Sequence, residues 1–522
     1  MGPMKSSNTP GETDLSAEYI VLHRKASEVG QKHIFRWWEK LDDQGRRKLL
    51  DQVRSIDFDL VSCLTSRCLR RISRKFAGSI EPAEVVPVPQ TPAHHAARQS
   101  MADLGGEVIR RGEVGLFIVA GGQGTRLKYD PPKGAFPLSP ITGKCLFHVF
   151  AEKLLAASRR YGVAIPLYVM TSTTNNDATQ ELFRLNQFFG LGKHNVMFVV
   201  QDMLPCVTPA GKIILKDKDE IAMNPNGHGG SLKALRDGGA LADMRKRGVK
   251  YISYQQVDNV LVKSVDPVFV GYHVAANAEM SLKVVRKRNA EEKLGIVGSI
   301  GGRTALVEYS DLSPEMMHAT HPDGSLKYGV GSIAVHLLNV DFVERETDQG
   351  FSLPYHPARK TVSRIGDDGL HAKAEELNGV KFETFVFDAL RDARHSVVME
   401  VQREEEFAPL KNASGEDSPA TAKQALTNAY GRWLRAAGVH VPTDPDGNVI
   451  GAIEISPLFA LDAEELAAKI GPHRPVFNGE LLLDEGMTAP FPQRVSTPAP
   501  PMFRCTPMTL PEVPESEPRV EA

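Results

Sequence analysis

A buried strand that leads directly into a glycine-rich turn is the feature that most constrains this sequence. Residues 114–120 form an apolar run, and Gly121-Gly122-Gln123-Gly124-Thr125 follows it. Near-continuous apolar runs are typical of parallel strands with both faces buried. Glycines at the end of such a strand let backbone N–H groups approach an anion. Since Arg126 and Lys133 stand just behind the turn, the segment predicts a site for the phosphates of a nucleotide.

Two common phosphate-binding motifs do not fit this turn. A P-loop places Lys-Ser or Lys-Thr after its last glycine, but Thr125 and Arg126 stand there. A dinucleotide fingerprint counted from Gly122 requires a third glycine at Leu127. The glycines alone would also suit a plain tight turn. The following Pro132-Lys133-Gly134 favours a phosphate site of another kind.

Composition narrows the class of protein. The chain has 522 residues, 42% of them apolar and 24% charged, which predicts a globular protein of two or three domains. Lys plus Arg (62) nearly balance Asp plus Glu (64), so a nucleic-acid or membrane-surface partner is not expected. No run of about 18 apolar residues predicts a membrane span. The five sparse cysteines and the polar N-terminus favour a cytoplasmic protein.

The spacing of apolar residues and prolines divides the chain into five segments. They are a disordered segment 1–14, a helical N-terminal domain and linker 15–98, a catalytic domain 99–411, a C-terminal helix plus small β module 412–490, and a disordered proline-rich tail 491–522. The C-terminal helix is expected to begin at Ser418-Pro419, an N-cap followed by a first-turn proline.

The catalytic domain alternates strand-like and helical runs. Short apolar strands are predicted at 114–120, 167–170, 196–200 and 251–257. This alternation predicts an α/β fold with a doubly wound, mostly parallel, Rossmann-like central sheet. Ligands of such sheets bind beyond the carboxyl ends of the strands. The glycine turn and Asp258 both stand at such ends, which predicts one shared site.

Six further motifs follow the glycine turn in a characteristic order. They are Gln201–Val207, Asn224–Gly230, Val257–Asn259, Val307–Ser310, Phe385–Asp388 and Arg403–Asn412. In this order and spacing, the sequence resembles eukaryotic-type UDP-N-acetylglucosamine pyrophosphorylases and their uridylyltransferase relatives. The resemblance spans roughly residues 16–460 and includes the helical N-terminal segment. It implies a nucleotidyltransferase fold and transfer of a uridylyl group.

The resemblance assigns roles to individual residues. It implies that the nucleotide lies against Gly121, Gly122, Gly124, Thr125, Gln201, Gly227 and His228. Gln201 would pair with the uracil edge, because its amide offers both a donor and an acceptor. The cations implied to act on the phosphates are Arg126, Lys133, Lys381 and Lys411. Two plainer interpretations stay open: His228 as a surface-loop histidine and Lys381 as a solvated lysine.

The metal and the sugar have their own implied positions. The resemblance makes Asp258 the ligand of Mg²⁺, a cation that prefers oxygen ligands, although a lone Asp is more often a turn former. Gly295, Glu308 and Ser332 are the positions implied to face the sugar. Three residues depart from the family pattern: Lys128 and Ser332 replace a glycine and an asparagine, and His228 replaces another asparagine. The change at Ser332 leaves the identity of the sugar open.

The sequence thus predicts a Mg²⁺-dependent uridylyltransferase that converts UTP and a hexose 1-phosphate to UDP-sugar and pyrophosphate. The resemblance favours N-acetylglucosamine 1-phosphate as the substrate, with glucose 1-phosphate as the alternative. A non-catalytic nucleotide-sugar sensor is the alternative from another class, but Arg126, Lys133 and Asp258 are all present. We expect a monomer or weak oligomer without nucleic-acid or membrane partners.

Overall fold

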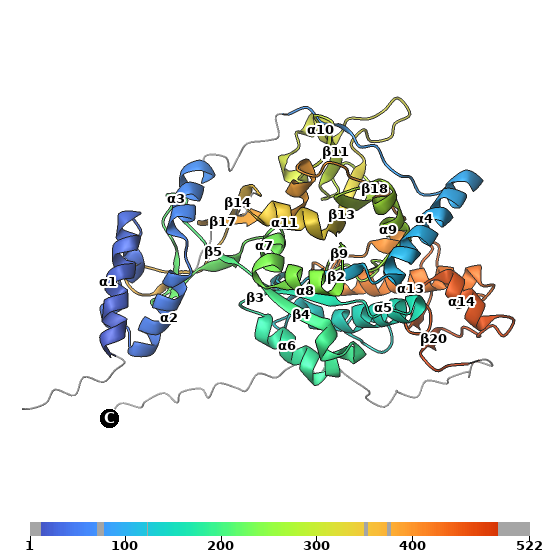
Figure 1. The fold of residues 1–522 in the computed structure, drawn as a ribbon, viewed down its shortest axis with the longest axis horizontal. Helices are drawn as coiled ribbons and strands as arrows, with labels where there is room; N and C mark the ends of the chain where they lie inside the picture. Colours follow the sequence, from blue (N-terminus) through green and yellow to red (C-terminus); the bar gives the residue numbers. More distant parts are fainter. Residues whose placement is uncertain (1–11, 70–77, 123, 349–352, 373–376, 489–522) are drawn as a thin grey trace, which may run out of the picture.

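The molecule has three parts arranged along its long axis, with N-terminal helices at one end, a central sheet, and a small C-terminal module (Figure 1). The computed structural model describes residues 12–69, 78–122, 124–348, 353–372 and 377–488. The predicted tail 491–522 lies outside these ranges, as does segment 1–14 except that helix α1 (Glu12–Glu28) begins within it. None of the helices in the described ranges has the length and apolar character needed to cross a bilayer.

The half of the central sheet that carries the glycine turn is parallel. Its strands are β2 (Val114–Val119), β3 (Leu167–Ser172), β4 (Val196–Gln201) and β9 (Tyr251–Gln256). They pair in the order β9-β2-β3-β4, and every one of these pairings is parallel. The four strands predicted from the apolar runs are therefore confirmed, and their carboxyl ends meet at one edge.

The other half of the sheet is largely antiparallel. Strand β13 (Val330–Asn339) runs antiparallel to β9 and continues the sheet beyond it. The remaining strands of this half are β1 (Glu81–Pro82), β10 (Met280–Arg286), β11 (Ile296–Ile300), β12 (Arg303–Val307) and β18 (Val398–Glu400). Among them only β10 and β18 form a parallel pair. The strand direction changes between β9 and β13, and this change marks the boundary between the two halves of the sheet.

Alternate residues of β2 face two separate cores, because side chains of a strand point to opposite faces in turn. Leu116 and Ile118 belong to one core, whereas Phe117 and Val119 belong to the other. The first core is covered by α4 (Pro92–Arg110), α5 (Leu146–Tyr161), α6 (Asn176–Leu185) and α9 (Pro267–Ala275). The second is covered by α7 (Gly230–Asp237), α8 (Ala240–Arg247) and α11 (Val340–Asp348). The doubly wound α/β architecture is thereby confirmed.

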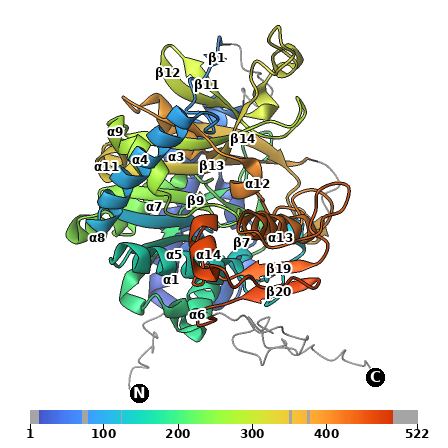
Figure 2. The same ribbon diagram turned by 90° about the vertical axis from the view of Figure 1, so that its right-hand side faces the viewer.

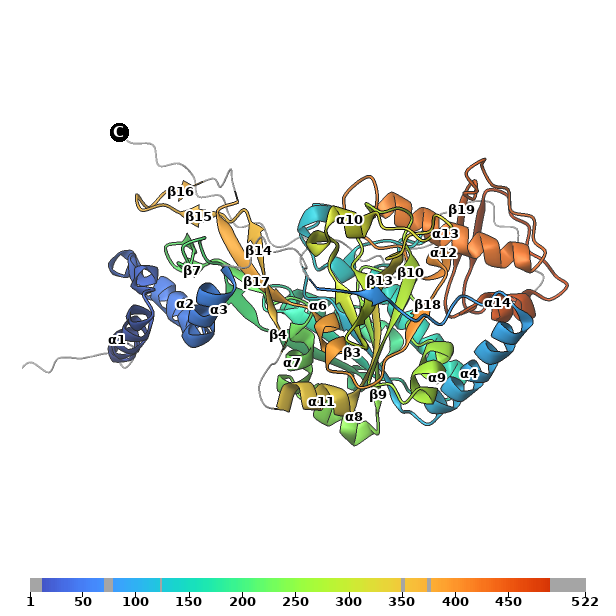
Figure 3. The ribbon, with the colours of Figure 1, turned by 90° about the horizontal axis from the view of Figure 1, so that it is seen from above.

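The N-terminal helices share a core with strands that come much later in the chain. Helices α2 (Asp43–Arg54) and α3 (Phe58–Arg67) lie beside a group of two-stranded ribbons (Figure 3). These ribbons are β5 (Met203–Pro205) with β8 (Met223–Pro225), β6 (Leu215–Asp217) with β7 (Glu220–Ile221), and β14 (Tyr355–Lys360) with β17 (Gly379–Thr384). One hydrophobic cluster joins Leu49 and Val53 to Ile213 and Phe382.

The C-terminal module begins as predicted. Helix α13 (Pro419–Ala436) starts with a capping box between Ser418 and Thr421, and it has proline in its first turn. Strands β19 (Ala452–Ile455) and β20 (Glu480–Leu483) form a parallel pair beside α14 (Ala463–Ile470) (Figure 2). Glu454 accepts hydrogen bonds of 2.8 Å from the backbone N–H groups of Ile141 and Thr142. These bonds join the module to the loop ahead of α5.

Candidate active site

The glycine turn packs closely against the amide of Gln201. A Cβ atom at Gly121 would stand 2.1 Å from Gln201 Nε2, so only glycine allows this approach. Gln201 ends β4 and is 4% exposed, and its Oε1 has no hydrogen-bond partner among the described residues. A buried amide oxygen without a partner is costly to leave unsatisfied. The geometry therefore suits a ligand that brings a hydrogen-bond donor to this place.

Exposed residues stand on both sides of the buried Gly124. Gly122, Thr125 and Arg126 are all exposed, and Arg126 makes no ion pair with any residue that the structure describes. Lys128 adopts a left-handed backbone with φ of 52°, a conformation that suits glycine. This explains why a glycine is usual at position 128 in the family pattern. Arg126 is therefore available for an anionic ligand.

Two lysines and one aspartate meet at the carboxyl edge of the sheet. Lys133 Nζ lies 3.0 Å from Asp258 Oδ2, and both side chains are largely buried. Burial by itself raises the pKa of the Asp258 carboxyl, but the charges of Lys133 and Lys411 outweigh it and lower that pKa below its usual value. Asp258 is therefore ionised at neutral pH. The structure brings together three of the predicted site residues.

Lys411 reaches this place on a segment that is tied to Asp258 by the backbone. The N–H of Leu410 donates to the carbonyl oxygen of Asp258 at 2.9 Å. The Lys411 Nζ lies 4.0 Å from Asp417 Oδ2, and its own N–H donates to the Asp417 carbonyl at 2.7 Å. Lys411 is thus fixed from both sides, with its charge near Asp258.

The loop before α7 is held by the end of β17. Gly227 has φ of 85°, and a Cβ atom there would stand 2.4 Å from the carbonyl oxygen of Thr384. The N–H of Val386 donates to His228 Nδ1 at 3.2 Å, and burial lowers the pKa of His228 to about 4. The ring lies 5.3 Å from the ring of Phe385, centroid to centroid. His228 is therefore a neutral, fixed side chain and not an exposed histidine on a surface loop.

The three positions predicted to face the sugar lie on the antiparallel half of the sheet. The N–H of Ser332 donates to the carbonyl of Gly295 at 3.0 Å, so these two residues are neighbours. Burial raises the pKa of Glu308 to about 7, and Asp311 adds to this effect while Lys411 opposes it. Because Lys411 acts on Glu308 and on Asp258, all three belong to one electrostatic neighbourhood.

Sequence comparison agrees with this arrangement. Residues 74–423 match the family described as UTP–glucose-1-phosphate uridylyltransferase. The chain is a member of this uridylyltransferase family. UDP-N-acetylhexosamine pyrophosphorylase-like protein 1 of Homo sapiens is 36% identical over 496 residues, covering 89% of this chain and 97% of the human protein. The UDP-N-acetylglucosamine pyrophosphorylase of Saccharomyces cerevisiae is 34% identical, covering 84% of this chain and 95% of its own length.

Solved structures agree with the fold. The crystal structure of the uridine diphosphate N-acetylglucosamine pyrophosphorylase from Trypanosoma brucei, in complex with an inhibitor, superposes with a TM-score of 0.75. It is 24% identical and covers 93% of this chain and 99% of its own. The α/β nucleotidyltransferase architecture predicted from the sequence is thus that of known uridylyltransferase relatives.

Among the predicted cations, Lys381 forms an ion pair with a carboxylate on its own strand. Lys381 lies on β17, and its Nζ donates to Glu383 Oε1 at 2.7 Å. The cations that lower the pKa of Asp258 are Lys133 and Lys411. Lys381 therefore has a carboxylate partner of its own, and the structure does not join it to the Lys133–Asp258–Lys411 group.

Two side chains that the sequence analysis did not single out lie near Glu308. His356 Nε2 stands 2.8 Å from Asp388 Oδ2, and both charges act on the Glu308 carboxyl. Asp388 ends the Phe385–Asp388 motif, which offered a local signal for it. His356 lies on β14, where nothing in the surrounding sequence distinguishes it. Its place becomes evident only from the fold.

The residues around Asp258 suit a metal ion that arrives with a triphosphate. Within the described ranges, no group of three or more His, Cys, Asp or Glu side chains forms a site that would hold a metal by itself. Mg²⁺ is often bound through one or two carboxylates while substrate phosphates complete its ligands. The ionised Asp258 carboxylate fits that arrangement, because the cationic residues beside it would also attract the phosphates.

Proposed function

We propose that the protein transfers the uridylyl group of UTP to a hexose 1-phosphate, most readily N-acetylglucosamine 1-phosphate, and releases pyrophosphate. One observation carries this proposal: the unsatisfied amide of Gln201 and the charged group Lys133–Asp258–Lys411 lie at the same edge of the sheet. The amide suits a nucleotide base, and the charged group suits phosphates. Family membership and the names of the relatives support the same reaction.

The reaction needs no covalent intermediate on the protein. An oxygen of the sugar phosphate attacks the α-phosphorus of UTP, and the bond from that phosphorus to the pyrophosphate oxygen breaks. The pyrophosphate leaves with the electron pair, so negative charge builds up on it. Arg126 and Lys133 would neutralise that charge, and Lys411 would hold the phosphate of the sugar. Catalysis of this kind depends on positioning and charge stabilisation.

We propose Mg²⁺ as the cofactor, held by Asp258 together with the phosphates. Bound there, it would neutralise phosphate oxygens and favour the departure of pyrophosphate. The role of Asp258 is to present an ionised oxygen at neutral pH. The lowered pKa of this carboxyl supports that role.

The sugar is proposed to lie between Glu308 and Ser332. Ser332 Oγ accepts a hydrogen bond of 3.2 Å from the N–H of Ala334, so its hydroxyl is partly engaged. A serine reaches less far than the asparagine usual at this position. We therefore expect turnover of N-acetylglucosamine 1-phosphate with measurable activity on glucose 1-phosphate.

A cytoplasmic location and a monomeric or weakly oligomeric state complete the proposal. The near balance of 62 basic and 64 acidic residues supports a protein that acts on small molecules and not on nucleic acid or membranes.

The deciding experiment is release of pyrophosphate from UTP and Mg²⁺ with a panel of sugar 1-phosphates. We expect turnover that depends on the sugar phosphate and is highest with the N-acetylated sugar. Binding of UDP-sugar without turnover on any member of the panel would contradict the proposal and indicate a sensor.

A further inference from the structure

The two charges at the centre of the site come from segments that are far apart in the sequence. Asp258 follows β9, whereas Lys411 follows helix α12 (Arg403–Glu406). The backbone joins them through an antiparallel β-bridge between Asn259 and Pro409, in which the N–H of Leu410 donates to the Asp258 carbonyl at 2.9 Å. This bridge restrains the two segments at one place. A side chain adds a second restraint.

The side chain of Asn259 uses both ends of its amide on the segment that leads to Lys411. Its Nδ2 donates to the carbonyl of Glu406 at 2.7 Å, and its Oδ1 accepts from the N–H of Ala408 at 3.0 Å. Asn259 is 2% exposed, so both bonds are shielded from water. An aspartate would lack the donor, and an alanine would leave both backbone groups unsatisfied.

The segment on which Asn259 acts is itself anchored. Lys283 on β10 has its Nζ 2.5 Å from Glu406 Oε2 and 2.7 Å from Asp266 Oδ2. All three side chains are buried, and Asp266 also caps α9. Leaving a buried charge without its partners costs free energy, so Lys283, Asp266 and Glu406 are held together. Asn259 therefore connects the Asp258 loop to a fixed point of the fold.

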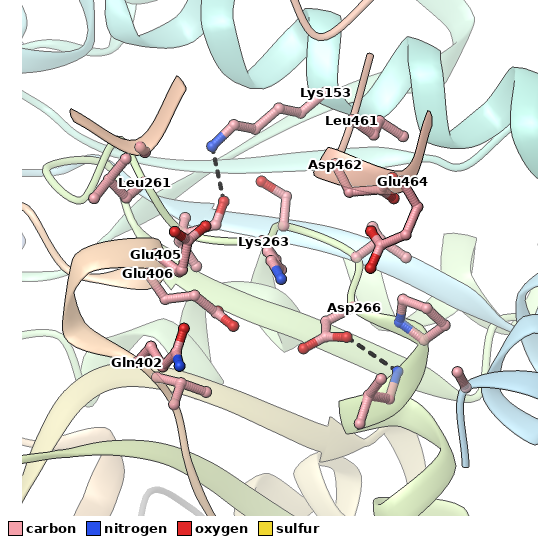
Figure 4. A pocket seen from close by; sticks show the side chains of 18 of the residues that line it. Lys153, Leu261, Lys263, Asp266, Gln402, Glu405, Glu406, Leu461, Asp462 and Glu464 are labelled. Carbon is pink, nitrogen blue, oxygen red and sulfur yellow. Dashed lines mark hydrogen bonds between the residues drawn. The ribbon is translucent and has the colours of Figure 1, made fainter. Parts of the chain in front are cut away.

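The chain that follows Asn259 borders a cavity. A cavity of about 650 Å³ lies behind it, lined in part by residues 261–268 and by Gln402, Glu405 and Glu406 (Figure 4). Across the cavity, Lys153 Nζ donates to the carbonyls of Val260 and Val262 at 2.6 and 2.8 Å. Val260 and Val262 are themselves buried in the first core, so packing and these hydrogen bonds together hold the loop beside the cavity.

We propose that Asn259 is a positioning residue that sets the spacing between Asp258 and Lys411, with Lys153 supporting the same loop from the cavity side. The proposal rests on the proposed uridylyl transfer, in which both charges act on the phosphates at once. A small displacement of a catalytic group lowers turnover far more than it lowers the stability of the fold. Asn259 touches neither charge through its side chain, so it acts through the two segments.

The test compares Asn259→Ala and Asn259→Asp with a matched control. Asn378 makes the same pair of bonds in the β14–β17 region, since its Nδ2 donates to the Val362 carbonyl at 2.9 Å and its Oδ1 accepts from the Val362 N–H at 2.8 Å. Asn378→Ala therefore removes an equivalent amide clamp outside the site. Each full-length variant is assayed for kcat, KM and Tm, and for amide hydrogen exchange at Leu410 without ligand.

We expect kcat of both Asn259 variants to fall about 10²-fold with KM for UTP changed less than about threefold, and exchange at Leu410 to accelerate. Asn378→Ala should keep kcat even if its Tm falls equally. Lys153→Met is the second variant if the Asn259 variants do not fold, and it should also lower kcat.

Two results would overturn the proposal. One is an unchanged kcat with unchanged exchange at Leu410 in a folded Asn259 variant. The other is a loss of kcat that follows Tm equally in the Asn259 and Asn378 variants. Absence of turnover in the wild-type protein would instead refute the proposed function, and the exchange at Leu410 would still test the clamp.

Discussion

Lys133 Nζ stands 3.0 Å from Asp258 Oδ2. The oxygen proposed to meet the metal is therefore already paired with a cation proposed to meet the phosphates. A metal ion and Lys133 compete for the same carboxylate until the triphosphate gives Lys133 another partner.

The first prediction concerns this competition. Lys133→Ala should raise the affinity of the nucleotide-free protein for Mn²⁺ by about tenfold, because a positive charge next to the ligand oxygen is removed. The same change should lower kcat by about 10²-fold or more. Mn²⁺ binding is measured by electron paramagnetic resonance, with Lys128→Ala as an exposed control. Unchanged Mn²⁺ affinity would show that Lys133 and a metal ion do not compete for the Asp258 carboxylate.

The second prediction separates two neighbouring glycines. Gly121→Ala should displace the Gln201 amide, because the new Cβ would lie 2.1 Å from Nε2. Both Gly121→Ala and Gln201→Ala should therefore narrow the preference for UTP over CTP, measured as the ratio of the two kcat/KM values, by about 1–3 kcal/mol. No described atom outside the adjacent residues lies within 4 Å of a Cβ at Gly122, so Gly122→Ala should retain the Tm. Retained base preference in Gly121→Ala would contradict the placement of uracil at Gln201.

The third prediction concerns the sugar. Ser332→Asn should raise the ratio of kcat/KM for N-acetylglucosamine 1-phosphate over glucose 1-phosphate, because the amide reaches further and offers a donor and an acceptor. One added neutral hydrogen bond corresponds to about 0.5–1.5 kcal/mol, or roughly 2- to 12-fold in the ratio. Competition kinetics with both sugar phosphates measures it directly. A ratio that does not change means that position 332 does not contact the sugar.

The fourth prediction is a pH dependence of stability. Burial raises the pKa of Glu308 to about 7, whereas an unfolded glutamate titrates near about 4.3. Between these pH values the unfolded chain loses the proton of this carboxyl while the folded protein keeps it. Rising pH therefore lowers the free energy of unfolding, and the stabilisation from protonated Glu308 is fully lost above pH 7. Glu308→Gln should therefore gain stability relative to wild type between pH 5 and pH 8, by up to about 3 kcal/mol.

Urea unfolding at both pH values checks this gain. The exposed Glu464, changed to Gln, serves as the control and should show no such pH-dependent difference. An equal effect of Glu308→Gln at both values would mean that the carboxyl is already ionised at pH 5.

The parallel half of the sheet was predictable because its information is local. Each of its strands is a short apolar run, and the functional residue stands directly at its end, as with Gln201 and Asp258. A glycine that must approach another backbone or side chain also leaves a local signature, as at Gly121. These features depend on residues that are adjacent in the sequence, so the sequence alone is sufficient to predict them.

The remaining features depend on partners far along the chain. The bond from Asn259 to the Glu406 carbonyl spans 147 positions, and no local pattern marks that residue as a clamp. The antiparallel half of the sheet depends on which strands meet, and this is decided by packing across the whole domain. The partner of Lys381 is of the same kind, because the carboxylate of Glu383 stands beside its Nζ only once β17 has formed.

The core shared by the N-terminal helices and the ribbons has a mechanical consequence. The ribbons β5–β8 and β14–β17 connect this end of the molecule to the central sheet. The N-terminal helices are therefore held to the rest of the chain by packing against these ribbons. Gly227 and Val386 stand just after β8 and β17, so the loops that hold His228 begin where the ribbons that pack against the N-terminal helices end.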